Sequence, residues 1–363
     1  MGIVVAKLGS SIVADENGLL RADVLKSVCE DVASIRAGGD EVVLVSSGAI
    51  ARGVAELGLG SRPTALDELQ AASAIGQAKL FTEWNAALGA CDIRAAQVLL
   101  TLHDIEERAS NVSVGATLRK LLAWHVVPVI NENDTTTTEE ITFGDNDVLA
   151  AQVAILLGAR LLVLLTDADG LHEADPRVQP DAALVTDVRD FAELEGFDIA
   201  QHANELGSGG MRSKVVSAEM ATAAGIETVV APGRTASSLR IAAAGERIGT
   251  RFHAGKGGHG SFKAWLRFAK TAAGSVVVDE GAAKALEAGG TSLLPVGVRS
   301  VEGDFAAGEA VDVLCGDRAI GKGLASYSAA DLRIVMGLQT PEVLGLLPGA
   351  PGEAIHRDRF VLA

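Results

Sequence analysis

The chain has 363 residues, 48% of them hydrophobic and only 4% aromatic, which excludes a disordered protein and a small disulfide-stapled fold and leaves room for two or three domains. Its formal net charge of -16 is uneven, because residues 1–255 carry 20 Lys and Arg against 35 Asp and Glu, whereas residues 256–363 carry 11 against 12. An acidic first part repels phosphate backbones, so nucleic acid is not its expected partner.

The sequence lacks targeting and metal-binding patterns. The opening residues, MGIVVAKLGSS, lack the charged and long apolar regions of a secretory signal, and no apolar run reaches the roughly 20 residues that span a bilayer. The cysteines form no CxxC pair, and the seven histidines show no HxxxH or HExxH spacing. We therefore expect a cytoplasmic protein without a membrane partner, a disulfide framework or a metal held by its own side chains.

Short runs rich in Val, Ile and Leu alternate with longer Ala-rich segments through the first part of the chain, a pattern typical of βαβ units on a mainly parallel sheet. The expected strands are residues 3–7, 41–46, 93–98, 126–130, 160–165 and 227–230. The expected helices include residues 22–35, 65–88, 109–124, 147–157 and 210–224.

Two of the expected strands run directly into glycine, at Lys7-Leu8-Gly9 and at Ser46-Ser47-Gly48. In an open parallel sheet such junctions lie at the carboxyl ends of strands, where ligands bind and where glycine lets backbone N–H groups approach a phosphate or carboxylate. Lys7 at this position could reach a phosphate as a point charge. Taken singly, each junction is also compatible with an ordinary βα turn.

The most polar stretch of the chain follows the strand expected at residues 126–130. It reads NENDTTTTEE from Asn131 and GDND from Gly144 to Asp147. Loops on a rigid sheet often carry function, and these side chains could hydrogen-bond the ammonium and carboxylate groups of a small zwitterion. Solvated turns with a helix N-cap at Asp145 or Asp147 are the alternative, and the residues alone leave both interpretations open.

Residues 208–214, SGGMRSK, join paired glycines to the start of an expected helix, with Lys214 one turn inside it. Backbone amides, the positive end of the helix and this lysine could together hold the phosphates of a nucleotide. A plain helix start with a surface lysine is the alternative. The chain contains no GxxxxGK[ST] motif, so nucleotide binding would require an architecture other than a P-loop.

Glycine crowds the chain at HAGKGGHG, residues 253–260, and we place the end of the first domain at residue 255. Residues 256–271 are the predicted linker, and residues 272–363 are predicted to form a smaller β-rich, barrel-like domain. Residues 255–260 also satisfy GxGxxG, but the chain after them is too short for the remainder of a dinucleotide-binding half.

A basic run from Arg251 to Lys270 contains no acidic residue and includes Trp265. Such a run could bind RNA by charge and stacking. We favour an amphipathic connector whose aromatic side chains pack between domains, because residues 256–363 as a whole are almost neutral.

Six segments in chain order resemble the glutamate 5-kinases of the amino-acid kinase family: VVAKLGSS, VLVSSGAIARG, VPVINENDTTTTEEITFGDNDVLAA, LLVLLTDADGLHEADPR, GSGGMRSK and VVVDEGAAKAL. The C-terminal part is similar to the PUA domain that bacterial members append. The resemblance implies a three-layer αβα domain that uses ATP and magnesium to phosphorylate the side-chain carboxylate of L-glutamate, the first step of proline biosynthesis. It also implies a homo-oligomer with proline as feedback inhibitor.

The resemblance assigns catalysis to Lys7, Lys214 and Asp147. It assigns glutamate binding to Ser47, Asp134, Asn146 and Asp145. It assigns ATP binding to Lys7, Gly9, Thr166, Asp167, Ser208, Gly209, Gly210, Met211, Arg212, Ser213 and Lys214. A sibling kinase acting on another small acid, and an RNA-binding protein acting through the PUA-like domain, are the alternatives.

Overall fold

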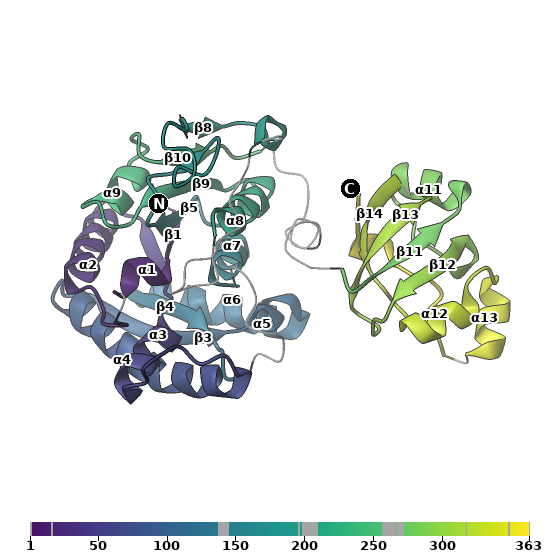
Figure 1. Ribbon diagram of the computed structural model, residues 1–363, viewed down its shortest axis with the longest axis horizontal. Helices are drawn as coiled ribbons and strands as arrows, with labels where there is room; N and C mark the ends of the chain where they lie inside the picture. The colour runs from purple at the N-terminus through teal and green to yellow at the C-terminus, as the bar shows by residue number, and fades with distance from the viewer. Residues whose placement is uncertain are drawn as a thin grey trace. The chain divides into compact units, whose positions relative to one another are not determined.

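The computed structural model describes residues 2–15, 17–136, 145–194, 197, 210–255, 266, 272–316, 318–347 and 349–362. The chain divides into two compact units, Met1–Gly258 and His259–Ala363 (Figure 1). Each unit has its own hydrophobic core. The predicted linker, residues 256–271, lies outside the described residues except for Leu266, so its limits and those of the two domains stay a prediction.

The described residues of the first unit contain ten strands. They are β1 (Ile3–Leu8), β2 (Glu41–Val45), β3 (Arg94–Leu100), β4 (Val126–Glu132), β5 (Leu161–Thr166), β6 (Leu171–His172), β7 (Leu184–Val185), β8 (Asp187–Val188), β9 (Glu227–Pro232) and β10 (Thr250–Phe252). The helices are α1 (Ser10–Val13), α2 (Ala22–Ala37), α3 (Ala49–Leu57), α4 (Leu66–Gly89), α5 (Leu102–Glu106), α6 (Arg108–Ala123), α7 (Asp145–Leu157), α8 (Met211–Ala223) and α9 (Ser238–Ala243), with a 3₁₀ turn η1 (Phe191–Leu194). The strands and helices expected from the sequence are all present, with ends shifted by at most two residues.

The large sheet of the first unit has the strand order β3-β4-β2-β1-β5-β9-β10-β8. All neighbours from β3 to β9 pair in parallel, whereas β10 is antiparallel to β9 and parallel to β8. Lys7 on β1 lies opposite Val45 on β2 and Leu164 on β5, so these central strands end at one common edge. The mainly parallel sheet predicted from the alternating pattern is confirmed.

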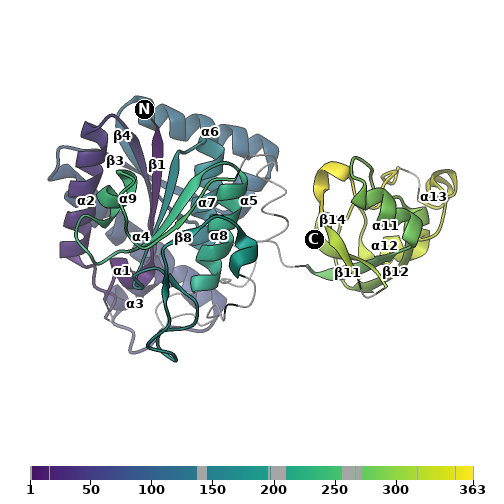
Figure 2. The same ribbon diagram turned by 90° about the horizontal axis from the view of Figure 1, so that it is seen from above.

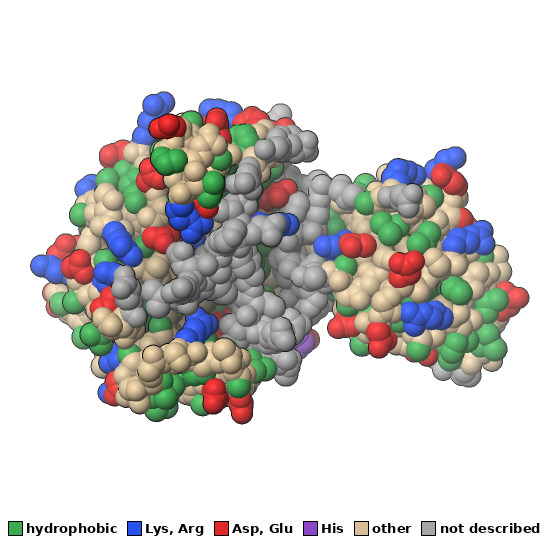
Figure 3. Space-filling model, in the orientation of Figure 1, with side chains coloured by type: hydrophobic (Ala, Val, Ile, Leu, Met, Phe, Trp, Pro, Cys, Tyr) green, Lys and Arg blue, Asp and Glu red, His purple; other side chains and the backbone are tan. Residues whose placement is uncertain are grey.

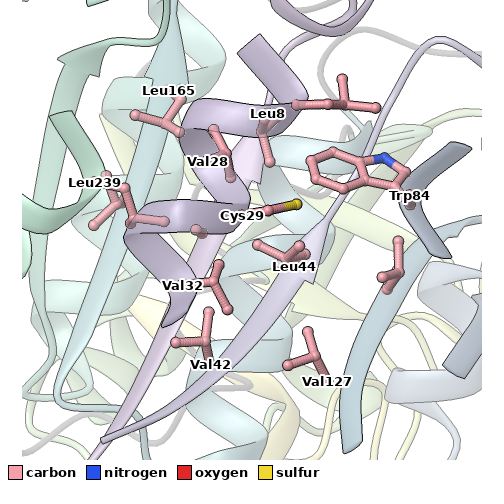
Figure 4. Close-up of a cluster of buried hydrophobic side chains, with 14 of the residues drawn as sticks. Leu8, Val28, Cys29, Val32, Val42, Leu44, Trp84, Val127, Leu165 and Leu239 are labelled. Atoms are coloured by element: carbon pink, nitrogen blue, oxygen red, sulfur yellow. The ribbon is translucent and has the colours of Figure 1, made fainter. Parts of the chain in front are cut away.

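Helices cover both faces of this sheet, and Figure 2 shows α2 on one side with α7 and α8 on the other. On the first side, α2 buries Val24, Val28, Val32 and Ile35 at helical spacing, and all four belong to the core cluster of this unit. Figure 4 shows Val28 and Val32 packed with Trp84 of α4 against β1 and β2. Every residue of β5, LLVLLT, is buried because both of its faces are covered. The first unit is therefore the three-layer αβα domain that the resemblance implied.

The second unit is β-rich, as expected, and it also contains short helices. Its elements are β11 (Gly274–Val278), α11 (Glu280–Glu287), η2 (Pro295–Gly297), β12 (Val298–Gly303), β13 (Ala310–Cys315), β14 (Arg318–Leu324), α12 (Ala329–Val335), α13 (Thr340–Leu346), η3 (Arg357–Arg359) and β15 (Phe360–Leu362). The sheet order is β12-β11-β13-β14-β15, with β11 parallel to β13 and the other pairs antiparallel.

Positive and negative side chains are mixed on the face drawn in Figure 3, over the described parts of both units. Arg251, the first residue of the basic run, already pairs with Glu227, its Nη1 lying 2.8 Å from Oε2. Most of the remaining run falls outside the described residues, so both interpretations of it stay open. Among the helices that the structure describes, none is long and apolar enough to cross a membrane.

Candidate active site

The polar side chains singled out in the sequence gather at the carboxyl edge of the large sheet. β1 ends one residue after Lys7, Ser47 follows β2, Asp134 follows β4, and Thr166 closes β5. The strands before β5 lie on one side of β1, whereas β5 and β9 lie on its other side. Such a change of direction in strand order is where open α/β sheets bind ligands.

Lys7 and Lys214 converge on the carboxylate of Asp147. The Nζ atom of Lys7 lies 2.6 Å from Oδ1 of Asp147, and Nζ of Lys214 lies 3.1 Å from Oδ2. Ser213 also donates its hydroxyl to Oδ2, over 2.7 Å. All four residues are buried, and Asp147 is fully so. Two lysines from opposite ends of the first unit therefore share one carboxylate, and we call these three residues the lysine–aspartate cluster.

The starts of two helices and the end of one strand hold this cluster. Lys7 projects from β1 toward the face of the sheet that α7 and α8 cover, while Asp147 lies in the first turn of α7 and Lys214 in the first turn of α8. Helix α8 begins after Gly210, whose carbonyl oxygen accepts hydrogen bonds from Ser213 at 2.8 Å and from Lys214 at 3.3 Å. The helix start predicted from the glycines is confirmed, but Lys214 is buried and not a surface lysine.

The helix that follows the polar stretch begins two residues earlier than predicted. α7 starts at Asp145, so Asp147 lies inside its first turn, and its carboxylate contacts the two lysines instead of capping the helix. The prediction that Asp147 could serve as the N-cap was therefore wrong, because an N-cap residue precedes the first helical residue.

Burial disfavours charge in the cluster, and the attraction between Asp147 and the two lysines opposes this effect. Burial alone would raise the pKa of Asp147, but the ammonium groups of Lys214 and Lys7 hold this pKa well below its usual range. Burial lowers the pKa of Lys7, against the opposing effect of Asp147 and with a further lowering by Lys214. The ammonium groups of Lys7 and Lys214 lie on both oxygens of the Asp147 carboxylate, and such a concentration of positive charge suits an anionic ligand.

Gly9 leaves space beside the Lys7 ammonium group. Its backbone N–H donates to the carbonyl oxygen of Leu165 on β5 over 3.1 Å, which holds the β1–α1 turn against the sheet. A β-carbon at this position would lie 3.9 Å from Nζ of Lys7, an ordinary contact distance. A longer side chain would occupy space next to the ammonium group, so glycine keeps that side open to a phosphate.

The residues assigned to glutamate binding lie at the ends of β2 and β4 and the start of α7. Ser47 is buried and precedes Gly48, whose φ of 95° favours glycine at the start of α3. The side-chain oxygen of Asn146 accepts a hydrogen bond from the backbone N–H of Glu132 at 3.2 Å, which ties α7 to β4. Asp134 is buried two residues beyond β4. The side chain of Asp145 lies outside the described part of the chain.

The residues assigned to ATP binding surround the ends of β1 and β5 and the start of α8. Thr166 donates its hydroxyl to Asp167 over 3.1 Å at the end of β5. Gly210 is the N-cap of α8, and Met211 and Arg212 lie in the first turn of this helix. Ser208 and Gly209 lie outside the described residues, so only part of the glycine-rich segment is placed.

Two polar residues of α4 at this edge were not predicted from the sequence. Ser73 donates its hydroxyl to Oδ2 of Asp134 over 2.5 Å, and Gln77 donates through Nε2 to the carbonyl oxygen of Glu132 over 3.0 Å. The two residues are four positions apart and so share one face of the helix. A polar pair on an otherwise apolar buried face was the available signal, but the sequence did not indicate which loop that face would meet.

Comparisons with known proteins agree with this geometry. A family model for the amino acid kinase family matches residues 2–232, and a model for the PUA domain matches residues 274–347. The glutamate 5-kinase of Meiothermus ruber is 44% identical over 366 residues, which cover 99% of this chain and 95% of the relative. The glutamate 5-kinase of Stutzerimonas stutzeri strain A1501 is 44% identical over 364 residues, covering 99% and 97%. The chain belongs to the amino acid kinase family, among the glutamate 5-kinases.

The fold of the first unit also occurs in a solved structure. An isopentenyl phosphate kinase, known from X-ray structures, superposes with a TM-score of 0.50 at 19% identity, over 69% of this chain and 99% of that protein. At this identity the likeness concerns the fold alone. It supports an amino acid kinase fold for the first unit, with the PUA part as an addition.

Proposed function

We propose that the chain transfers the γ-phosphoryl group of ATP to the side-chain carboxylate of L-glutamate, making glutamyl 5-phosphate in the first step of proline biosynthesis. The similarity to glutamate 5-kinases over almost the whole chain supports this activity. The structural observation that carries the proposal is the convergence of Lys7 and Lys214 on Asp147 at the carboxyl edge of the sheet.

The acceptor group needs no general base. A glutamate side chain has a pKa of about 4.3, so it is already a carboxylate at neutral pH. One carboxylate oxygen attacks the γ-phosphorus, the bond from that phosphorus to the β,γ-bridging oxygen breaks, and ADP leaves with the electron pair. The enzyme must therefore overcome the repulsion between two anions, which is a task for placed positive charge.

Lys7 and Lys214 supply that positive charge. Their ammonium groups would contact oxygens of the transferring phosphoryl group, where negative charge builds up in the transition state. Asp147 would orient both lysines, since it contacts each of them at hydrogen-bond distance. The cluster is held by β1, α7 and α8 before substrates arrive, so little reorganisation is needed during transfer.

The remaining assigned residues would bind the two substrates on either side of this cluster. Asp134 carries a carboxylate suited to the substrate ammonium group, and we propose that glutamate is bound by Ser47, Asp134, Asn146 and Asp145. We propose that ATP is bound by Lys7, Gly9, Thr166, Asp167 and residues 208–214. Support for these roles comes from the position of the described members at the ends of adjacent parallel strands.

Magnesium would enter with ATP. Among the described residues, no group of three or more His, Cys, Asp and Glu side chains could hold a metal ion. Mg²⁺ commonly keeps several waters and binds to substrate phosphates with only one or two protein carboxylates. Asp167, directly after β5, is the described carboxylate that we propose for this contact. When bound, the ion would neutralise phosphate charge.

Three further properties are proposed from the family alone. We propose that the protein forms a homo-oligomer, that proline inhibits it, and that it works in the cytoplasm. Measurement of the molecular size in solution, with and without proline, tests the homo-oligomer. Titration of the kinase activity with proline tests the inhibition.

An ATP-dependent hydroxamate assay with L-glutamate tests the proposed reaction. Hydroxylamine traps an acyl phosphate, so the purified protein should form glutamyl hydroxamate only when ATP, magnesium and glutamate are all present. A panel containing aspartate and N-acetylglutamate serves as the control for acceptor choice. Equal or higher rates with another acid would identify a sibling kinase and overturn the assignment of glutamate.

A further inference from the structure

Ser73 and Asp134 form a buried hydrogen bond between α4 and the loop after β4. The hydroxyl of Ser73 donates to Oδ2 of Asp134, and the two residues are 1% and 9% exposed. The partners are 61 positions apart, so this contact is part of the tertiary structure and not of a local turn. A hydrogen bond to a buried carboxylate is stronger than one between neutral groups.

Asp134 depends on such a donor because its surroundings disfavour its charge. Burial raises the pKa of Asp134, while the hydroxyl of Ser73 and the positive charge of Arg62 oppose this change. Arg62 is exposed and belongs to the connection between α3 and α4, so its charge acts through a solvated path. Ser73 is the closer and more rigid of the two supports, since it lies inside α4.

Helix α4 holds the loop that carries Asp134 at a second point. One turn after Ser73, Gln77 donates to the carbonyl oxygen of Glu132, the last residue of β4. The two donors on one helix face thus constrain both the backbone before Asp134 and the Asp134 side chain. Their spacing sets the position of the carboxylate relative to the sheet edge.

We propose that Ser73 is a positioning residue for substrate binding, which directs the Asp134 carboxylate toward the ammonium group of glutamate. This inference rests on the proposed function, because it takes Asp134 as the ammonium-binding group. Ser73 itself contacts Asp134 and acts through it. Loss of the hydroxyl should leave Asp134 less well oriented and less readily ionised, while the lysine–aspartate cluster is unaffected.

Steady-state kinetics of Ser73→Ala test the proposal. Alanine removes one hydroxyl from a buried position and is well tolerated in a helix. We expect the glutamate KM to rise about ten-fold, as for the loss of a hydrogen bond to a charged group, with kcat and the ATP KM changed less than about two-fold. Thr82→Ala is the matched control, because Thr82 lies on the same helix and donates only to the carbonyl oxygen of Ala78 in its own helix.

A double-mutant cycle with Asp134→Ala separates positioning from a general loss of structure. In the Asp134→Ala background, Ser73→Ala should change the glutamate kcat/KM less than about two-fold, because the group it positions is gone. The initial slope at low glutamate provides kcat/KM without saturation. An unchanged glutamate KM in Ser73→Ala, or the same loss with and without Asp134, would overturn the proposal. Wild-type hydroxamate formation distinguishes these outcomes from failure of the proposed function itself.

Discussion

At the scale of single residues, the charge count of the lysine–aspartate cluster predicts which substitutions the fold tolerates. Two buried lysines share one buried carboxylate. Removal of one lysine leaves the other in contact with Asp147, whereas neutralisation of Asp147 takes from both buried ammonium groups the carboxylate that they share. The cost of an uncompensated buried charge is much larger than that of a lost surface contact.

We expect Lys7→Met and Lys214→Met to remain folded and to lose kcat by about 10²-fold or more, as for the loss of a preorganised electrostatic contact. Methionine retains much of the apolar stem while removing the charge, so cavity formation is limited. Arginine at either position should rescue poorly, because a planar guanidinium does not fit the site of a compact ammonium group. Lys26→Met, on the exposed side of α2, is the control. Retention of more than about a tenth of kcat would exclude that lysine from catalysis.

Asp147→Asn should lower both activity and stability. We expect a loss of about 3–5 kcal/mol in the free energy of unfolding at neutral pH, measured by urea denaturation, because both lysines lose their buried partner. The matched comparison is with the lysine variants above, which should lose less. Equal stability of Asp147→Asn and the wild type would contradict the charge count.

The stability difference between wild type and Asp147→Asn should also depend on pH. The lysines lower the pKa of Asp147 in the folded protein, so its contribution is complete above the unfolded Asp pKa of about 3.9 and is lost as the pH falls from there through the folded value. Urea midpoints should therefore differ by a constant amount at about pH 5–7 and approach each other below about pH 4. A difference that shrank near neutral pH would point to another titrating group.

At the scale of elements, the close packing of α3 and α4 positions the residues that we propose for glutamate binding. A β-carbon on Gly53 would lie 1.7 Å from the carbonyl oxygen of Ala72, and one on Gly76 would lie 1.8 Å from that of Ala49. Backbone atoms cannot move away as a flexible side chain can, so only glycine allows the two helices to approach this closely. α3 starts directly after Ser47 and Gly48, which links this packing to the site.

Gly76→Ala should therefore separate α3 from α4, lower the unfolding free energy, and raise the glutamate KM more than the ATP KM. The affected stretch of α4 carries Ser73 and Gln77, which hold the loop after β4. Gly89→Ala is the matched control on the same helix, since a β-carbon there meets nothing within 4 Å and alanine should be neutral or slightly stabilising. Thermal unfolding with glutamate and ATP titrations of both variants checks this expectation.

At the scale of the whole molecule, all the proposed site residues belong to the first compact unit, Met1–Gly258. Among the described residues, no strand of the second unit belongs to the sheet of the first unit. No described residue of the second unit belongs to the hydrophobic core of the first. Two units with separate cores can in general fold independently.

A chain ending at Gly258 should consequently fold cooperatively and retain hydroxamate formation within about an order of magnitude of the full-length kcat/KM. Regulation by proline and the oligomeric state are the properties most open to change. Circular dichroism melting and the hydroxamate assay on the truncated chain check this. A cooperatively folded but inactive truncation would show that the PUA part contributes to the active site.

The sequence by itself determined the order and type of the main elements, because alternating apolar runs are local signals, and the structure places the ends of these elements within two residues of the predicted ones. The motifs also indicated Lys7, Asp147 and Lys214 as candidates. Their contact was decided only by the tertiary structure: the strand order β2-β1-β5 and the placement of α7 and α8 over one face bring the three side chains together. Long-range strand pairing has no local sequence signal, and for the same reason the contact between Ser73 and Asp134 could not be read from the chain.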